Sequence, residues 1–181
     1  MDKYFKILSI YVMITLLLTA CNELAVQAQP AEPTSSKTIT YQAMLGKSVN
    51  DTDVIDFIVN NNCSASGPFQ LCKEVGMALW TDSAQIVKTV YLLSGGENGF
   101  ERYRGKLPFG LTFYDPMWLV EDKLKKFDAD NSLQQAGLPD EGNTPDHFHY
   151  NAVYKRFGIV VIYDSPVADQ DAYIYAILVN G

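Results

Sequence analysis

The sequence has few of the residues that most catalytic sites need. Among 181 residues there are only two histidines, His147 and His149, and three cysteines. It has no Gly-x-Ser-x-Gly turn to hold a serine nucleophile, and no glycine-rich loop that ends in Lys-Ser or Lys-Thr to bind phosphate. We therefore expect a protein that is not an enzyme and that needs no cofactor.

Basic charge is also scarce. The chain carries 14 Lys and Arg against 21 Asp and Glu, which gives a formal net charge of −7. This balance argues against nucleic acid as a partner, because phosphate binding depends on clustered cations. The hydrophobic fraction of 48% is typical of a globular domain that builds its own core.

The N-terminus lacks an apolar run of the length that a membrane-spanning helix needs. Residues 7–18 are largely apolar, but a span takes roughly 20 residues. Lys3 and Lys6 precede the run, as in the positive region of an export signal. The sequence thus predicts a signal peptide over residues 1–20.

This signal ends in Leu18-Thr19-Ala20-Cys21, which resembles the lipobox of bacterial lipoproteins. The resemblance implies cleavage before Cys21, lipid (diacylglycerol and palmitate) on that cysteine, and a membrane anchor in the cell envelope with the body facing the periplasm. Asn22 resembles the signal for an outer-membrane destination. The alternative is an ordinary signal peptide followed by a chance cysteine. Residues 21–37 contain prolines and serines and predict a flexible tether.

The other two cysteines, Cys63 and Cys72, would then lie outside the cytoplasm, where thiols are normally oxidised. Gly67-Pro68 between them predicts a turn that brings the chain back on itself. We predict a Cys63–Cys72 disulfide that closes a short loop. The spacing of the pair differs from that of a catalytic Cys-x-x-Cys motif.

The hydrophobic pattern predicts an α+β fold, with short helices packed on an antiparallel sheet. The spacing of Val54, Phe57 and Ile58 favours a helix over Asp51–Val59. β-branched and aromatic runs predict strands over 75–80, 85–93, 149–155, 157–164 and 172–179, and the polar stretch 128–145 predicts a long loop.

A second helix is expected to begin at Pro116, because proline is favoured in the first helical turn. Asp115 or Thr112 could cap this helix. The residues that we expect it to bury are Trp118, Val120 or Leu119, and Leu124.

The same sequence features occur in the same order in the two halves of the body. Gly46, then Asp51 and a helix, corresponds to Gly110, then Asp115 and a helix, and each half continues into an expected hairpin. We hypothesise a tandem repeat of a helix-plus-β-hairpin module, with a first module over 38–98 and a second over 99–181. The alternative is that two α+β segments are alike in composition only.

Leu107-Pro108-Phe109-Gly110-Leu111 and the helix after it resemble the opening of small envelope modules of the SmpA/OmlA (BamE-like) and β-lactamase-inhibitor-protein-like class. The helix of those modules usually ends in Leu-Gly-x-Pro, whereas here Leu124 is followed by Lys125-Lys126-Phe127. The same opening resembles lipoprotein immunity proteins. These resemblances imply a protein that binds another protein through a sheet face or loops, with no shared motif for the binding surface.

His147 and His149 alternate, so a strand would place both imidazoles on one face beside Asp146. No third ligand has a matching spacing, and we therefore expect no metal site, although these two histidines are its only candidates. The surface that we predict for a partner is acidic and aromatic: Asp128, Asp130, Asp140, Glu141, Asp146 and Tyr150.

Three functions are compatible with these observations. The first is a lipid-anchored, periplasm-facing binding protein, such as an immunity or inhibitor protein against an envelope-acting toxin or enzyme. The second is an accessory lipoprotein of outer-membrane assembly. The third is a small metal-dependent hydrolase that uses His147 and His149. In the first two, the partners are a membrane, through the lipid on Cys21, and a protein.

Overall fold

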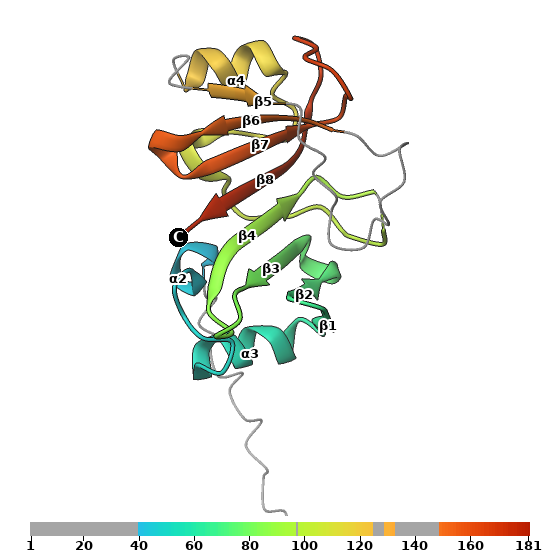
Figure 1. The fold of residues 1–181 in the computed structure, drawn as a ribbon. Coiled ribbons are helices and arrows are strands. Elements are labelled where there is room, and N and C mark those ends of the chain that lie inside the picture. Colours follow the sequence, from blue (N-terminus) through green and yellow to red (C-terminus); the bar gives the residue numbers. More distant parts are fainter. Residues whose placement is uncertain (1–39, 97, 125–128, 133–148) are drawn as a thin grey trace, which may run out of the picture. The chain divides into compact units, whose positions relative to one another are not determined.

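The strands of this protein form one antiparallel sheet. The computed structural model describes residues 40–96, 98–124, 129–132 and 149–181, and for 129–132 the backbone alone. Eight strands within these ranges pair in the order β1-β2-β3-β4-β8-β7-β6-β5 (Figure 1). Their bounds are β1 Ser64–Ser66, β2 Phe69–Cys72, β3 Met77–Thr81, β4 Val87–Leu93, β5 Ala129–Ser132, β6 Tyr150–Tyr154, β7 Ile159–Tyr163 and β8 Ile174–Asn180.

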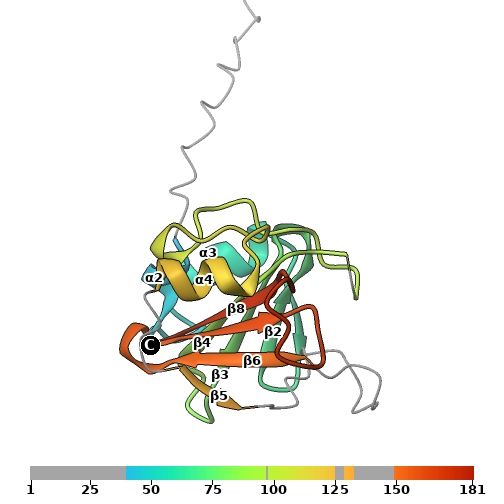
Figure 2. The same cartoon turned by 90° about the horizontal axis from the view of Figure 1, so that it is seen from above.

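Short helices cover one face of this sheet (Figure 2). They are α2 Tyr41–Met44, α3 Thr52–Asn60 and α4 Met117–Lys123, together with the 3-10 turns η1 Lys73–Val75, η2 Pro108–Gly110 and η4 Lys155–Phe157. In the described ranges, no helix has the length and apolar character needed to cross a membrane. The α+β class is therefore confirmed, with the sheet as its dominant element.

The body begins close to the position expected from the sequence. Residues Ile39–Gly181 form one compact unit, and the sheet runs without a break across the expected module boundary at residue 98. The five strands and two helices expected from the sequence are present, each within a few residues of its expected ends. The elements α2, β1, β2 and β5 were not predicted, and β5 lies in the segment expected to be loop.

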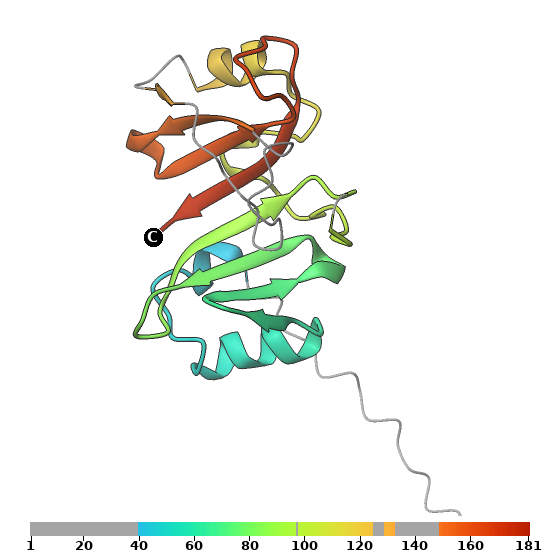
Figure 3. The same cartoon turned by 45° about the vertical axis from the view of Figure 1, so that its right-hand side comes forward.

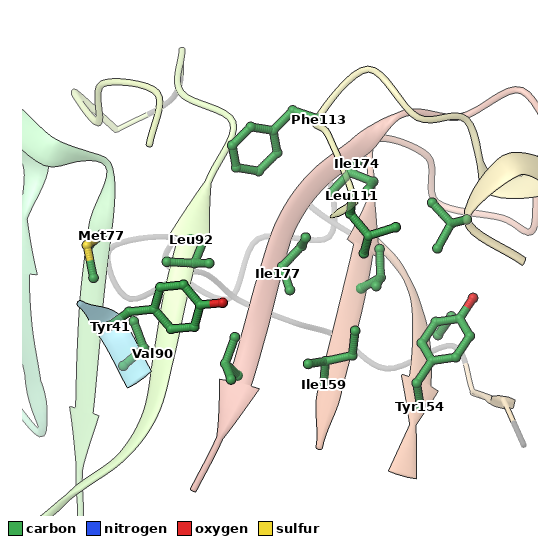
Figure 4. Close-up of a cluster of buried hydrophobic side chains, with 14 of the residues drawn as sticks. Tyr41, Met77, Val90, Leu92, Leu111, Phe113, Tyr154, Ile159, Ile174 and Ile177 are labelled. Atoms are coloured by element: carbon green, nitrogen blue, oxygen red, sulfur yellow. The ribbon is translucent and has the colours of Figure 1, made fainter. Parts of the chain in front are cut away.

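The main core lies between the sheet and the helices (Figure 4). The sheet contributes inward-facing residues such as Met77, Leu92 and Ile177, and α3 contributes Val54, which is fully buried. Leu111 and Phe113, from the segment before α4, fill the space over the centre of the sheet. Because this core continues from β3 to β7, the described part of the body folds around one hydrophobic interior.

The start of α4 differs from the sequence prediction. The helix begins at Met117, one residue after Pro116, and no side chain caps it. The expected cap by Asp115 or Thr112 was therefore wrong, because Asp115 accepts hydrogen bonds from the Thr112 amide and hydroxyl instead. Val120 and Leu124 are buried as expected, but Trp118 is 51% exposed, so its expected burial was wrong. The reason is helical phase: Met117, Val120 and Leu124 are spaced to face the sheet, and Trp118 follows Met117 by one residue, which rotates it toward solvent.

The predicted disulfide is confirmed. Cys63 and Cys72 are bonded, and they flank the hairpin of β1 and β2, which turns at Gly67-Pro68. Cys72 is fully buried in the main core, so the bond ties the edge of the sheet to the interior.

Both halves of the sheet contain the same local features (Figure 3). The chain enters β3 and β7 through a 3-10 turn that ends in a left-handed glycine, Gly76 in one half and Gly158 in the other. The register of β3 with β4 shifts after Trp80, and that of β7 with β8 shifts after Ile162. Among the described residues, the order helix, two strands, 3-10 turn and two strands occurs from α3 to β4 and again from α4 to β8.

Candidate functional site

The sheet face opposite the helices is the candidate site. We call it the free face because no helix of the described ranges covers it, although Phe100 and His149 pack on part of it. Cross-strand partners share a face of a sheet, so the pairing register shows which side chains belong together. One row of paired positions crosses all eight strands of the described sheet: Ser64, Leu71, Ala78, Tyr91, Leu178, Val160, Val153 and Asp130. Tyr91 and Leu178 form the middle pair of this row.

The side chains on the free face are mostly large and apolar. Leu71, Ala78 and Ile162 are buried there in a second hydrophobic cluster, separate from the main core. Six others are only partly buried: Phe69, Trp80, Tyr91, Val153, Val160 and Leu178. Because these six come from six neighbouring strands, one from each of β2, β3, β4, β8, β7 and β6, they place apolar atoms at the surface across the width of the sheet.

The centre of the free face combines aromatic packing with one polar pair. The rings of Phe69 and Tyr91 meet edge to face, with their centroids 5.8 Å apart. Burial raises the pKa of Tyr91 above its ordinary value, so its hydroxyl remains neutral at physiological pH. In the neighbouring row, Thr89 Oγ1 donates to Asn180 Oδ1 at 2.8 Å. Neutral groups therefore dominate this part of the face.

Most of the acidic surface predicted from the sequence cannot be placed. Asp128, Asp140, Glu141 and Asp146 lie outside the described residues, as do His147 and the lipidation candidate Cys21. Asp130 belongs to β5, where it pairs with Val153.

Tyr150, the aromatic member of that predicted surface, is only 5% exposed and packs in the main core. Desolvation by burial raises the pKa of Tyr150. This placement corrects its prediction as part of the exposed partner surface, and the physical reason is strand alternation, which turns Tyr150 with Tyr154 toward the helices.

His149 is held within the fold. Its side chain is 8% exposed, its Nδ1 lies 3.1 Å from the carbonyl oxygen of Tyr163, and its ring stacks on that of Tyr175 with centroids 4.2 Å apart. In the described ranges, no group of three or more His, Cys, Asp or Glu side chains is placed to hold a metal ion.

The tyrosines divide between the core and the surface, as their positions on strands suggest. Tyr154 and Tyr163 are fully buried, and burial raises the pKa of each hydroxyl. Tyr114 and Tyr173, by contrast, are 68% and 55% exposed.

The free face was not predicted from the sequence, although a signal for it is present. The run Ile159-Val160-Val161-Ile162-Tyr163 is apolar at every position, whereas a strand with one solvated face alternates between apolar and polar residues. This continuous apolar character indicates a strand that carries apolar side chains on both faces of the sheet. No family model matches the chain, and neither a curated protein nor a solved structure matches it significantly.

Proposed function

We propose that this protein is a non-catalytic binding protein, built from two tandem modules of one kind, that holds a protein partner on the free face of its sheet. The proposed modules run from α3 to β4 and from α4 to β8. Their support is the recurring element order, the glycines at positions 76 and 158, and the matching register shifts.

The observation that carries the proposal is the row of apolar residues centred on Tyr91 and Leu178. A monomeric protein seldom leaves contiguous apolar surface across several strands, because each exposed side chain forgoes burial that a partner would supply. Trp80 and Tyr91 are the residue types that contribute most to protein interfaces. A face whose centre is neutral and aromatic suits a folded protein better than a charged ligand.

The proposed place of action is the cell envelope. The lipobox supports a lipid anchor at Cys21 on the periplasmic side, favouring the outer membrane, and the Cys63–Cys72 disulfide suits an oxidising compartment. An immunity or inhibitor protein against an envelope-acting toxin or enzyme would combine such an anchor with a binding face and no chemistry of its own.

Site-specific photocrosslinking in cells tests the proposal. Benzoylphenylalanine replaces Trp80 or Val160 on the free face, and in matched variants it replaces Val59 or Ile55 on α3, which lies on the other side of the sheet. Val59 and Ile55 are 66% and 41% exposed, so they report random encounters. We expect Trp80 and Val160 to yield the same crosslinked protein, which the control positions do not yield. Equal crosslinking at all four positions, or no crosslinking from Trp80 and Val160, would reject the proposed binding face.

The identity of the crosslinked protein separates the two envelope roles. A secreted toxin as the crosslinked protein would indicate immunity, provided that cells without this chain die when the toxin is present and survive when it is absent. A component of outer-membrane assembly, with sensitivity of the deletion strain to detergents and large antibiotics, would indicate the accessory role.

A further inference from the structure

The loop between β4 and α4 borders an open, largely apolar cavity. The cavity has a volume of about 520 Å³, which lies within the range of small-molecule sites, and residues 103, 105–107 and 110–114 line it. Leu111 and Phe113, which are also members of the main core, are among the lining residues, together with Leu107. Leu107, Leu111 and Phe113 thus give the cavity an apolar lining that is continuous with the hydrophobic interior.

Cations are concentrated beside this cavity in an otherwise acidic protein. Arg102, Arg104 and Lys106 are three of the 14 Lys and Arg in the chain, within five residues, and Lys106 lines the cavity. Arg102 is engaged locally: it donates to Ser94 O at 2.9 Å and to the Tyr114 hydroxyl. Arg104 and Lys106 are both exposed, and neither is paired with an acidic side chain of the described ranges.

We propose that this cavity binds a free single-chain carboxylate amphiphile of the fatty-acid type. The acyl chain lies against Leu107, Leu111 and Phe113, and the carboxylate faces the Lys106 ammonium. Charge complementarity selects the anion, because an unpaired cation at the mouth of an apolar cavity gains a strong partner only from a negatively charged group. The cavity is formed by a single loop and has the volume for one molecule, which favours a monomeric chain over a bilayer surface. This site is separate from the free face and does not depend on a protein partner.

Photoaffinity labelling of the full-length protein in neutral detergent tests the inference. The probe is hexadecanoate with a diazirine near the end of its chain, and labelled peptides are located by mass spectrometry after digestion. We expect the label within residues 103–114. Unlabelled hexadecanoate should compete for the site, and hexadecanol should not, because it lacks the charge.

The matched variants are Lys106→Glu and Lys88→Glu, which make the same change of charge on two exposed lysines. We expect Lys106→Glu to weaken labelling about tenfold, as for the loss of one charge-assisted hydrogen bond, and Lys88→Glu to leave it unchanged. Lys106→Gln, which adds no negative charge, should also reduce the label.

Three results would overturn the inference: labelling elsewhere in the chain, equal competition by hexadecanol, or equal losses in the two charge-reversal variants. Phosphatidylglycerol vesicles are tested as a second competitor of the probe. If the vesicles displace the probe and free hexadecanoate does not, the cavity binds a bilayer headgroup, and the proposal of a free single-chain ligand fails. None of these readouts depends on the crosslinks from Trp80 and Val160.

Discussion

Tyr91 of β4 lies directly opposite Leu178 of β8, where the two halves of the sheet meet. On one side of this pair, Ala78 of β3 pairs with Tyr91, and on the other side, Val160 of β7 pairs with Leu178. The Tyr91–Leu178 pair is thus flanked by one directly paired residue in each half of the sheet. Each of β4 and β8 would be an edge strand without the other half, and an unpaired edge exposes backbone groups to aggregation. The pairing of β4 with β8 satisfies both edges.

The free face should lose its partner when its centre becomes charged. We expect Tyr91→Lys to weaken partner binding at least about tenfold, because a buried unpaired ammonium would oppose the apolar surface of the partner. The crosslink yield from Val160, measured in the Tyr91→Lys background, reports this loss.

Val59→Lys is the matched control for that experiment, since Val59 is an exposed apolar residue of α3, on the helix-covered side of the sheet. It should leave the crosslink yield unchanged. Urea unfolding should show that Tyr91→Lys remains folded. If both variants reduce the yield equally, then Tyr91 has no special part in recognition.

The two left-handed glycines should differ in their tolerance of alanine. Gly76 and Gly158 have φ values of +67° and +65°, so each carries the same intrinsic penalty for a side chain, about 1–2 kcal/mol. A Cβ at Gly76 would also overlap the backbone of Glu101 and Tyr103, whereas at Gly158 it would lie 3.4 Å from Asn180 O. We expect Gly76→Ala to lower the free energy of unfolding by about 2–4 kcal/mol and Gly158→Ala by about 1 kcal/mol.

Urea denaturation of both variants, with the wild type as reference, measures this difference. Equal losses would show that the loop over Gly76 moves away without cost. The contrast also explains why a recurring glycine does not give equal constraints: only the first half has the 101–103 segment packed over its turn.

The strands were predictable from the sequence because their signal is local. Val87–Leu93 and Ile174–Asn180 are rich in β-branched and aromatic residues, and no helical spacing competes. The edge strand β1, Ser-Ala-Ser, was not predictable, because its residues have little β-propensity and it exists by pairing with β2. The free face was missed for a related reason: which face the helices cover is decided by tertiary packing.

Removal of the disulfide should destabilise the edge of the sheet. The bond joins residues nine apart, and the loss of loop-closure entropy predicts about 2–3 kcal/mol of stabilisation. We expect a Cys63→Ala, Cys72→Ala double variant to unfold at lower urea concentration by this amount. Reductant should destabilise the wild type to the same degree and leave the double variant unchanged. A reductant effect on both proteins would assign the loss to another cause.

Trp118 and Val120 provide a direct test of which face of α4 is buried. Trp118 is half exposed, and Val120 is fully buried. We expect Val120→Ala to cost about 2 kcal/mol in the free energy of unfolding, and Trp118→Ala less than about 1 kcal/mol. The reverse order in thermal or urea unfolding would show that α4 is rotated relative to the sheet.

Asp115 should make the stability of the fold depend on pH in the acidic range. Burial favours its neutral form, but hydrogen bonds from Lys123 Nζ at 2.7 Å and from the Thr112 amide and hydroxyl, each at 2.9 Å, outweigh this effect and lower the pKa of Asp115 below its ordinary 3.8. A carboxylate with a lowered pKa in the folded state stabilises the protein above its unfolded pKa. That stabilisation is lost as the pH falls through the folded value.

We therefore expect Asp115→Asn to be less stable than the wild type at pH 7 by about 1–3 kcal/mol, with the difference shrinking below the pH at which the unfolded carboxyl titrates. Asp53→Asn is the matched control: its ion pair with Lys47, at 2.9 Å, is on the surface, so its loss should change stability by less than about 1 kcal/mol. Urea unfolding of the three proteins between pH 2 and pH 7, at roughly unit steps that bracket the ordinary carboxyl pKa, measures both effects. If Asp115→Asn and the wild type lose stability in parallel across this range, the carboxylate of Asp115 does not cause the acid sensitivity, and the Thr112–Asp115–Lys123 contacts make no net contribution to the folded state.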